Sequence, residues 1–267
     1  MIRGLIISLC LTGTIQLVGD EPPNLVCKTL SSFDPSDWKS VEAAFKDATP
    51  VAMWQAWHNT PDPTFKPATI RTGRRGNSLW IYAQVEDVSI NDRATRLNEM
   101  RDIPPDLKPG QSFDFLSTTC GDVFEIFLRR SSQKDYFELH VTPQNQALQL
   151  HWAGAQDYID SDVEDVRESK RQIAKRVIPP PKAFTSHTRV DEKNQTWHVL
   201  AEVPAGLLDE SVGITNGEVW RFSFSRYDFT KGNDVPIVSS TSLHKSCNFH
   251  CQEEWGQLHF SKTDKPK

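Results

Sequence analysis

The sequence predicts an all-β protein, a β-sandwich with one charged helix inserted between its strands. Eight short segments are rich in aromatic and β-branched residues, and each is bounded by Gly, Pro, Asn or Asp. The chain has 267 residues, 37% of them hydrophobic, which is enough for one large domain with its own core. Many short strands separated by turn signals are typical of two packed sheets. No internal repeat and no change in composition marks a domain boundary.

The expected strands follow one another between residues 51 and 260. They are VAMWQAW (51–57), SLWIYAQVEDV (78–88), DVFEIFLRR (122–130), DYFELHVTP (135–143), ALQLHW (147–152), QTWHVLAEVP (195–204), EVWRFSFSRYDF (218–229) and GQLHF (256–260). Side chains alternate between the two faces of a strand, so regular apolar alternation marks an inward face. The clearest inward sets are Leu79, Ile81, Ala83 and Val85 in one strand and Phe137, Leu139 and Val141 in another.

Three segments depart from the strand pattern. Residues 24–50 are mixed in character, with a helical turn expected at 41–45. Residues 91–115 form a long polar loop, and loops of that length in a compact domain are usually functional or disordered. Residues 161–176 are the helix candidate, because one face is apolar and the rest mixes acids and bases, and three prolines at 179–181 end it.

The first residues resemble a secretory signal peptide. Arg3 supplies a positive start, and residues 5–11 form an apolar run that is too short to span a bilayer. A lipoprotein signal at Cys10 is disfavoured, because Leu9 before it is not a small residue. We therefore expect a signal peptide at 1–19, a single domain at 20–267, and a secreted protein, periplasmic or extracellular, without a membrane span.

Four cysteines remain after the expected signal peptide: Cys27, Cys120, Cys247 and Cys251. An even number in an exported chain favours disulfides, and the sequence leaves all three pairings open. The segment LHKSCNFHC also brings His244 and His250 close to the last two cysteines, so a zinc site is the alternative.

Composition argues against some partners and suggests others. The net charge of -5 gives no electrostatic reason to bind nucleic acid or an anionic membrane. Eight Trp and fourteen Phe are a large aromatic supply. Aromatic rings on a β scaffold can stack on the flat faces of sugars, although Trp is also a common core residue.

Several separated motifs, in order, resemble the family 9 carbohydrate-binding modules of exported bacterial proteins. They are LWIYAQVEDVSIND, ATRLNE, GDVFEIFLR, YFELHVTPQNQ, WRFSFSRYD and FHCQEEWGQLHF. The resemblance covers most of the chain, from about Trp38 to Phe260. It implies an immunoglobulin-like or jelly-roll sandwich, export, and work on carbohydrate beside cell-surface or polysaccharide-degrading proteins.

The resemblance also bears on the sugar site. Sugar-binding members hold a terminal sugar between two tryptophans, and Thr119 and Val238 or Ser239 stand at those places here. Glu125 matches an acid that accepts hydrogen bonds from sugar hydroxyls in those members. The resemblance therefore implies the sandwich fold, with a different arrangement at the sugar.

Glu125 and Glu138 lie on two consecutive expected strands. Alternation puts Glu125 with Phe127, and Glu138 with His140. If the strands pair as a hairpin around residues 130–134, the two carboxylates become neighbours. Three roles are open: acceptors for sugar hydroxyls, ion pairs with Arg129 or Arg226, or the two carboxyl groups of a glycosidase.

Two further side chains complete the expected sugar site. Arg226 continues the apolar face of its strand, so it needs a partner, for which Asp228 or Glu125 could serve. Trp54 and Trp57 have opposite parity, so one should be core and the other exposed for stacking. The predicted sugar-binding residues are Glu125, Glu138, His140, Arg226 and Trp57.

For metals, Asp87, Asn91 and Asp92 cluster in one loop and offer hard oxygen ligands, so calcium is a candidate cofactor. Haem ligation through Met53 or Met100 is a weaker alternative, since core methionine is commoner. We expect a protein that binds sugar or polysaccharide ends in support of carbohydrate catabolism and is not itself an enzyme. The alternatives are a glycoside hydrolase using Glu125 and Glu138, and a surface or assembly protein that kept only the fold.

Overall fold

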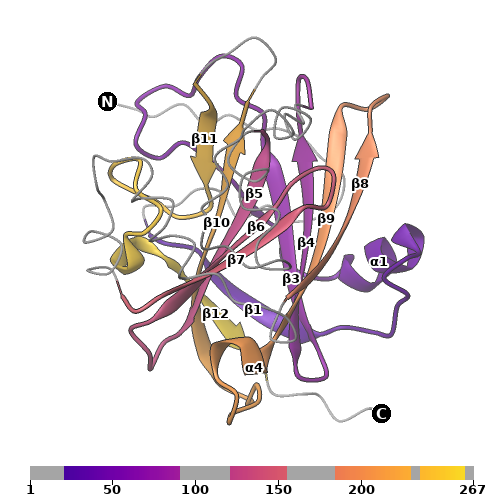
Figure 1. Cartoon of the computed structure of the whole chain (residues 1–267), viewed down its shortest axis with the longest axis vertical. Helices are drawn as coiled ribbons and strands as arrows, with labels where there is room; N and C mark the ends of the chain where they lie inside the picture. Colours follow the sequence, from indigo (N-terminus) through magenta and orange to yellow (C-terminus); the bar gives the residue numbers. More distant parts are fainter. Residues whose placement is uncertain (1–20, 91–120, 155–183, 230–234, 262–267) are drawn as a thin grey trace, which may run out of the picture.

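The computed structural model describes residues 21–90, 121–154, 184–229 and 235–261, and these residues form a β-sandwich (Figure 1). They contain twelve strands and only short helices, so the predicted all-β class is confirmed. The expected signal peptide, the long loop at 91–115 and the helix candidate at 161–176 lie outside the described residues. Among the described residues, no helix has the length and apolar character needed to cross a membrane.

The strands form two sheets joined by β1 (Asn24–Thr29). Sheet I has the order β7–β6–β5–β10–β12–β1, with β11 beside β10, and sheet II has the order β1–β3–β4–β9–β8, with β2 beside β3. The other strands of sheet I are β5 (Val123–Arg130), β6 (Tyr136–Val141), β7 (Ala147–Trp152), β10 (Val219–Asp228), β11 (Ile237–Ser240) and β12 (Gly256–Phe260). Those of sheet II are β2 (Val51–Ala52), β3 (Ala68–Arg75), β4 (Ser78–Glu86), β8 (Thr185–Asp191) and β9 (Thr196–Pro204).

Strand β1 belongs to both sheets because its two ends have different partners. Asn24 to Cys27 pair in parallel with β12, and Lys28 and Thr29 pair in parallel with β3. The other pairs in both sheets are antiparallel, as hairpin connections allow. The chain crosses from one layer to the other within a single strand.

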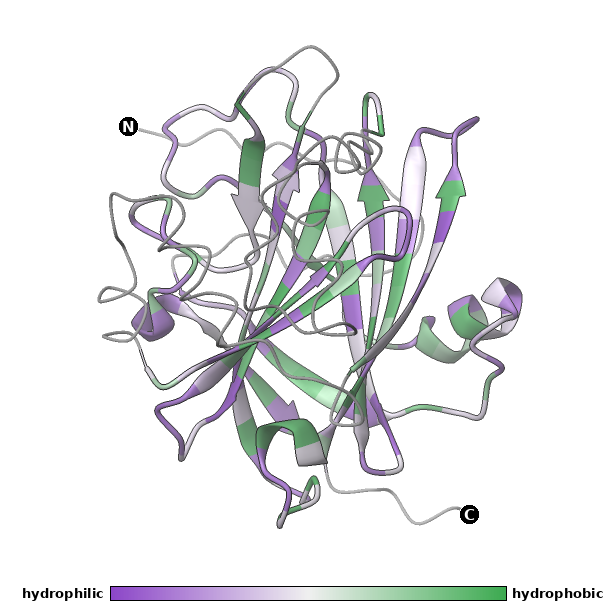
Figure 2. Cartoon of the chain, in the orientation of Figure 1, coloured by the Kyte–Doolittle hydropathy of each residue, from purple (hydrophilic) through white to green (hydrophobic). Residues whose placement is uncertain are grey.

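The main core fills the space between the sheets. Both inward sets expected from alternation are confirmed: every residue of the two sets is buried and belongs to this core. Figure 2 shows hydrophobic residues recurring along the strands of both sheets. The largest contributors are Trp197 of sheet II and Trp220 of sheet I, both fully buried. Burying such side chains is the dominant stabilising contribution to the sandwich.

Each sheet also has a covered outer face. Helix α1 (Trp38–Phe45), which Asp37 caps through its side chain, places Val41 and Phe45 over the outer face of sheet II. On sheet I the segment 249–255, with a 3-10 turn at Gln252–Glu254, covers Phe127, Tyr136 and Trp152. A short helix, α4 (Ala205–Leu208), follows β9. The sandwich therefore has two minor cores outside its main one.

Seven of the eight expected strands are confirmed, with small differences at their ends. The expected strand at 51–57 is mostly wrong, because only Val51–Ala52 pair and Trp54 forms one isolated bridge to Ser240. Four strands were not expected: β1, β3, β8 and β11. They are short or polar, and β8 lies at the edge of its sheet, where one side of the strand needs no apolar pattern.

Candidate functional site

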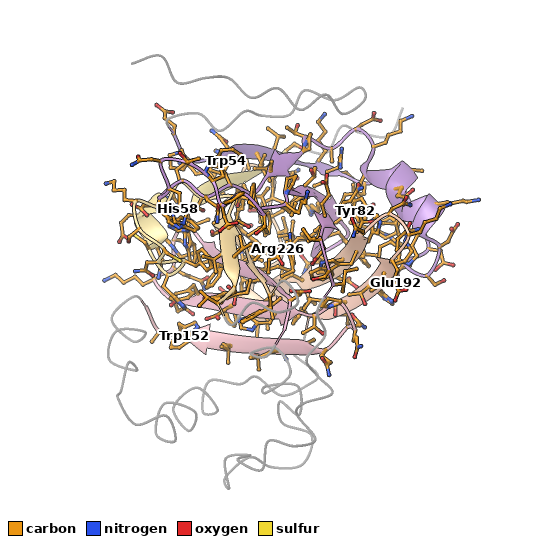
Figure 3. All side chains as sticks on the ribbon, turned by 90° about the horizontal axis from the view of Figure 1, so that it is seen from above. Trp54, His58, Tyr82, Trp152, Glu192 and Arg226 are labelled. Carbon is orange, nitrogen blue, oxygen red and sulfur yellow. The ribbon has the colours of Figure 1, made fainter. Side chains whose placement is uncertain are left out.

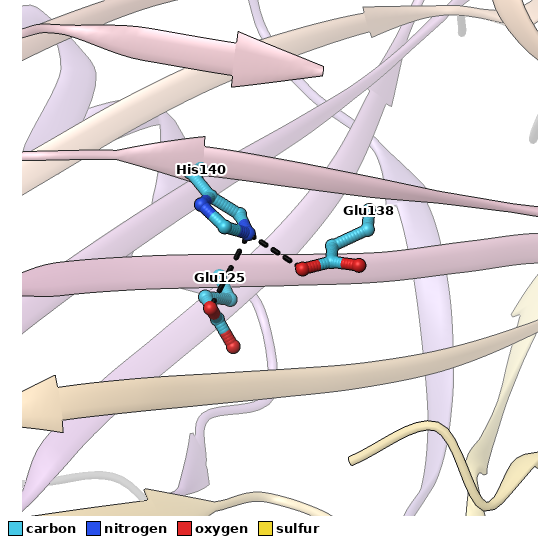
Figure 4. Close-up of side chains that lie close together, drawn as sticks. All are labelled: Glu125, Glu138 and His140. Carbon is cyan, nitrogen blue, oxygen red and sulfur yellow. Dashed lines mark hydrogen bonds and ion pairs between the residues drawn. The ribbon is translucent and has the colours of Figure 1, made fainter. Parts of the chain in front are cut away.

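Glu125, Glu138 and His140 converge on the outer face of sheet I (Figure 4). The Nε2 atom of His140 lies 2.7 Å from Oε1 of Glu138 and 3.3 Å from Oε1 of Glu125. One ligand atom from each residue lies within 4.8 Å of the other two. All three side chains are buried, with 5–6% of each residue exposed.

The hairpin register explains why the three side chains meet. In the pairing of β5 with β6, Glu125 stands directly opposite His140, and Phe127 stands opposite Glu138. Both strands therefore present these residues on one face, as the alternation predicted. The expected partners Arg129 and Arg226 are not the partners of the glutamates, because the imidazole between the two acids takes that place.

Glu138 is held from several sides. The indole Nε1 of Trp152 donates to its Oε2 at 2.8 Å, and Nε2 of His250 lies 3.9 Å from the same oxygen. His250 is in turn hydrogen-bonded through Nδ1 to the Tyr136 hydroxyl at 2.7 Å. These contacts fix the carboxylate so that Oε1 faces His140 and Glu125.

The two glutamates have opposite electrostatic environments. Burial raises the pKa of Glu125 to about 8, with the negative charge of Glu138 acting in the same direction and His140 opposing both. Burial also disfavours ionised Glu138, but the hydrogen bonds from His140 and Trp152 and the nearby histidines together lower its pKa. At neutral pH the cluster therefore holds one ionised and one protonated carboxyl group.

The two acids favour the imidazolium form of His140. Burial disfavours its imidazolium form, but the charge of Glu125 and the hydrogen bond and charge of Glu138 together raise its pKa. Glu125 attracts the imidazolium only when it is itself ionised, so Glu138 is the effective partner at neutral pH. Among the described residues, the other ring nitrogen of His140, Nδ1, is buried without a hydrogen-bond partner.

Aromatic side chains surround the cluster. The His250 ring contacts Phe127, Tyr136 and Trp152 at centroid distances of 5.2, 5.9 and 5.6 Å. Trp255 is fully buried below this group and donates from Nε1 to the carbonyl of Phe249 at 2.8 Å. The polar cluster thus lies in an aromatic environment of low polarity, which strengthens its electrostatic interactions.

Two groups at this site were missed by sequence reasoning. Trp152 was left without a role, and His250 was considered only as a zinc ligand beside the cysteines. A row of serines on β10 and β11 was also missed: Ser225 lies opposite Glu125 and Ser240, and Ser223 bonds Ser240 through its hydroxyl at 2.9 Å. These serines could have been found by asking which residues of the neighbouring strands lie on the same face as Glu125. That question needs the order of the strands in the sheet, which the sequence does not give.

Trp57 lies at the margin of the same face. It is half-buried, packs against the aromatic cluster, and its ring lies 5.9 Å from that of Phe249. His58 beside it is exposed. Trp54 is also half-buried and packs edge-on against Phe65 at 5.7 Å, so neither tryptophan of the pair is a core residue.

Arg226 does not belong to this site, and its expected place beside the glutamates is wrong. Its side chain lies on the inner face of β10, in the middle of the molecule (Figure 3). Its Nη2 atom lies 2.7 Å from Oδ2 of Asp87 and 3.0 Å from Oδ2 of Asp228, and Nη1 donates to the Glu86 carbonyl at 2.6 Å. The alternative reading, a buried ion pair with Asp228, is confirmed.

The expected calcium ligands are only partly described. Asp87 is buried beside Arg226, whereas Asn91 and Asp92 lie outside the described residues. Asp87 does form a group of close carboxylates with Asp122 and Asp228. Arg226 supplies one positive charge to this group and forms ion pairs with two of its three acids, Asp87 and Asp228.

The disulfide expectation is not confirmed. Cys27, Cys247 and Cys251 are free thiols, and Cys120 lies outside the described residues. Cys27 lies in the main core, where burial raises the pKa of its thiol, so it behaves as a small apolar side chain.

The alternative zinc site at the same cysteines is not supported, because neither cysteine belongs to a group of close metal-ligand atoms among the described residues. His244 bonds Glu254 at 3.1 Å and His250 bonds Tyr136 at 2.7 Å, so one ring nitrogen of each histidine already has a partner. Met53, the described haem candidate, is fully buried in the main core.

Comparisons with solved structures agree with the described fold. A candidate carbohydrate-binding protein from Bacteroides uniformis aligns over 90% of this chain and 99% of its own, with a TM-score of 0.60 and 13% sequence identity. A family 9 carbohydrate-binding module from Caldicellulosiruptor kristjanssonii, crystallised with cellotriose, aligns over 90% and 95% of the two chains at a TM-score of 0.55 and 13% identity. The same kind of module with glucose gives a TM-score of 0.54 at 13% identity, over 91% and 99% of the chains.

The chain is thus a β-sandwich with the fold of the family 9 carbohydrate-binding modules, as its motifs suggested. No protein-family model matches the sequence, and no curated protein matches it either. At 13% identity the likeness establishes the fold, and the ligand has to be argued from the side chains. Of the two expected clamp positions, Val238 packs against the aromatic cluster of sheet I, and Thr119 lies outside the described residues.

Proposed function

We propose that the protein binds carbohydrate at the outer face of sheet I, through Glu125, Glu138 and His140, with Trp57 at the margin. The observation that supports this most is the convergence of the three polar side chains in an aromatic environment, on a fold shared with modules crystallised with cellotriose and glucose. Carboxylates accept hydrogen bonds from sugar hydroxyls, and aromatic rings pack against the apolar faces of sugars. The ligand would be a sugar or a polysaccharide end.

Glu125 is the side chain best suited to meet a hydroxyl group. Among the described residues its one polar contact is the 3.3 Å approach to His140, whereas Glu138 already accepts from both His140 and Trp152. A buried carboxyl group with so few partners gains more from a ligand hydroxyl than a fully bonded one does. The covering segment at 249–255 would have to shift for a sugar to reach it.

The remaining expectations belong to the same proposal. Export from the cell, a role in carbohydrate catabolism and cooperation with cell-surface or polysaccharide-degrading proteins follow from the sequence motifs. Calcium at Asp87, Asn91 and Asp92 is part of the proposal as a stabiliser of the loop after β4 and not of the sugar itself.

Calorimetric titration of the purified protein tests the proposal. The panel contains glucose, cello-oligosaccharides and soluble polysaccharides, each with and without calcium. We expect saturable heat that is lost in Glu125→Gln and weakened in Trp57→Ala. Glu42→Gln, which changes an exposed acid on α1, is the matched control and should bind as the wild type does. Absence of heat with every sugar would favour the surface or assembly protein that kept only the fold.

A glycoside hydrolase is the second candidate, because burial and neighbouring charges shift the pKa values of the two glutamates in opposite directions. Such a separation is what an acid and a nucleophile or base require. Against it, the His140 imidazole lies directly between the two acids, where a glycosidic bond would have to fit. A product assay on the same samples distinguishes the two: turnover lost in Glu138→Gln would favour the enzyme.

A further inference from the structure

We propose that Glu125, Glu138 and His140 form a binding site for a divalent transition-metal ion of the zinc type. The proposal goes beyond sugar binding and does not depend on it, because it concerns a different ligand with its own readout. Three donor atoms already face a common point: Oε1 of each glutamate and Nε2 of His140. They come from paired strands and not from loops, so the backbone holds them in register.

The three side chains cannot satisfy one another. The Nε2 atom of an imidazole carries at most one proton, and here two carboxylate oxygens compete for it at 2.7 and 3.3 Å. Among the described residues, Glu125 has no other polar partner, although it is 95% buried. A buried carboxyl group without a donor is costly, and His140 can supply at most one positive charge against two carboxylates, so the fully ionised cluster is short of one positive charge.

A divalent ion fits that position by charge and by distance. Metal binding would release the protons of Glu125 and of Nε2 of His140 to solvent; two carboxylates then balance two positive charges, and a neutral imidazole completes a set of three ligands. Two ligands of a tetrahedral zinc ion, each about 2 Å from the metal, lie about 3.3 Å apart. The separation of His140 and Glu125 matches this value, and Glu138 needs to withdraw by roughly half an ångström.

The surroundings of Glu138 resemble the outer shell of a metal site, whereas Nδ1 of His140 has no hydrogen-bond partner among the described residues. Metal-bound carboxylates are usually fixed by further hydrogen bonds, and Trp152 donates to Oε2 of Glu138 while leaving Oε1 directed at the cluster. His250, fixed through Nδ1 by Tyr136, lies close enough to approach as a fourth group after a small movement. Mixed nitrogen and oxygen ligands favour zinc or its first-row neighbours over calcium, which prefers six to eight oxygens.

The other group of close metal-ligand atoms in the described residues differs from the Glu125 cluster. Asp87, Asp122 and Asp228 are also buried, but two of them, Asp87 and Asp228, form ion pairs with Arg226. Only the cluster of Glu125 combines imidazole with carboxylates and lacks an arginine contact among the described residues. With three protein ligands, a tetrahedral ion keeps a fourth position, at which water or a hydroxyl group can bind.

Metal binding is tested on the full chain, first stripped with a chelator and then dialysed against zinc chloride without sugar. We expect one zinc per chain, and a tetrahedral absorption spectrum when cobalt replaces zinc. His140→Gln and Glu125→Gln should each weaken binding by more than about tenfold, and Trp152→Phe, which removes the indole donor to Glu138 and keeps a smaller aromatic ring, by about tenfold. His151→Gln removes a half-exposed histidine that also faces a carboxylate and is the matched control.

The variants distinguish zinc bound at Glu125, Glu138 and His140 from zinc bound at the cysteines. Zinc binding that is lost in a Cys247→Ser, Cys251→Ser double variant but kept in His140→Gln would overturn the proposal. So would the absence of stoichiometric zinc on the wild type. If His140→Gln fails to fold, the isosteric Glu125→Gln with circular dichroism as a folding check decides the matter. Sugar titrations of the stripped and zinc-loaded protein then report the proposed function separately.

Discussion

Two buried acidic clusters lie on opposite faces of sheet I, and they differ in what balances them. On the inner face, Asp87, Asp122 and Asp228 gather around Arg226. On the outer face, the shared contact of Glu125 and Glu138 among the described residues is the single Nε2 atom of His140. The clusters are next to each other in the sheet, because Arg226 stands opposite Phe124 and its neighbour Ser225 stands opposite Glu125.

The difference in the partners of the two clusters indicates that the inner cluster stabilises the fold. Arg226 uses its two terminal nitrogens: Nη2 contacts two carboxylates, and Nη1 donates to the backbone carbonyls of Glu86 and Lys66. It therefore ties β10 to the end of β4 without help from a ligand. The outer cluster has too few donors for its acceptors, so it is complete only with something added. A buried polar group that remains incomplete is a candidate for function.

The largest expected effect follows from removing Arg226. Arg226→Met should lower the free energy of unfolding by about 3–5 kcal/mol, because it leaves buried carboxylates without their cation. Urea denaturation followed by fluorescence measures the change, and a loss of soluble protein would be the extreme form of the same result. Glu42→Ala, which breaks the exposed pair with Arg189, should cost no more than about 1 kcal/mol. A loss in Arg226→Met no larger than that in Glu42→Ala would mean that the inner cluster does not depend on its arginine.

Most of the fold was predictable because it depends on local pattern. The inward sets of β4 and β6 were correct, since alternation is fixed by the pleat of any strand. The strands β1, β3 and β8 were missed, because their sequences are short or polar and their pairing depends on partners distant in the chain. Propensity cannot report a strand whose stability comes from its neighbours.

The candidate site was predictable only in part, for the same reason. Glu125, Glu138 and His140 lie in one hairpin, so parity and a short turn were enough to bring them together. Arg226 was misplaced, because its strand joins β5 from elsewhere in the chain and parity alone does not tell which face is shared. The role of Trp152 at Glu138 also required the register of β7, which no local pattern gives.

A smaller effect separates the two glutamates of the outer cluster. Glu138→Gln should cost about 2–3 kcal/mol at pH 7, because His140 and the Trp152 indole lose a charged acceptor. Glu125→Gln should stay within about 1 kcal/mol of the wild type, since an amide replaces a carboxyl group that is already protonated and has few partners. Both are measured by denaturation in the presence of a chelator. A larger loss in Glu125→Gln than in Glu138→Gln would reverse the assignment of charge.

The smallest expected effect is the contribution of Glu125 to the pH dependence of the free energy of unfolding. Because burial raises its pKa to about 8, the folded protein keeps this proton well above the pH at which the unfolded chain releases it, near 4.5. The folded state then binds more protons in this interval, so the contribution of Glu125 is full below about pH 4.5 and is lost as pH rises toward 8. Denaturation midpoints of the chelator-treated protein between pH 5 and 9 should fall more steeply in the wild type than in Glu125→Gln. Parallel curves would mean that Glu125 is ionised in the folded protein. Glu125 would then resemble Asp87 and Asp228, the carboxylates that pair with Arg226.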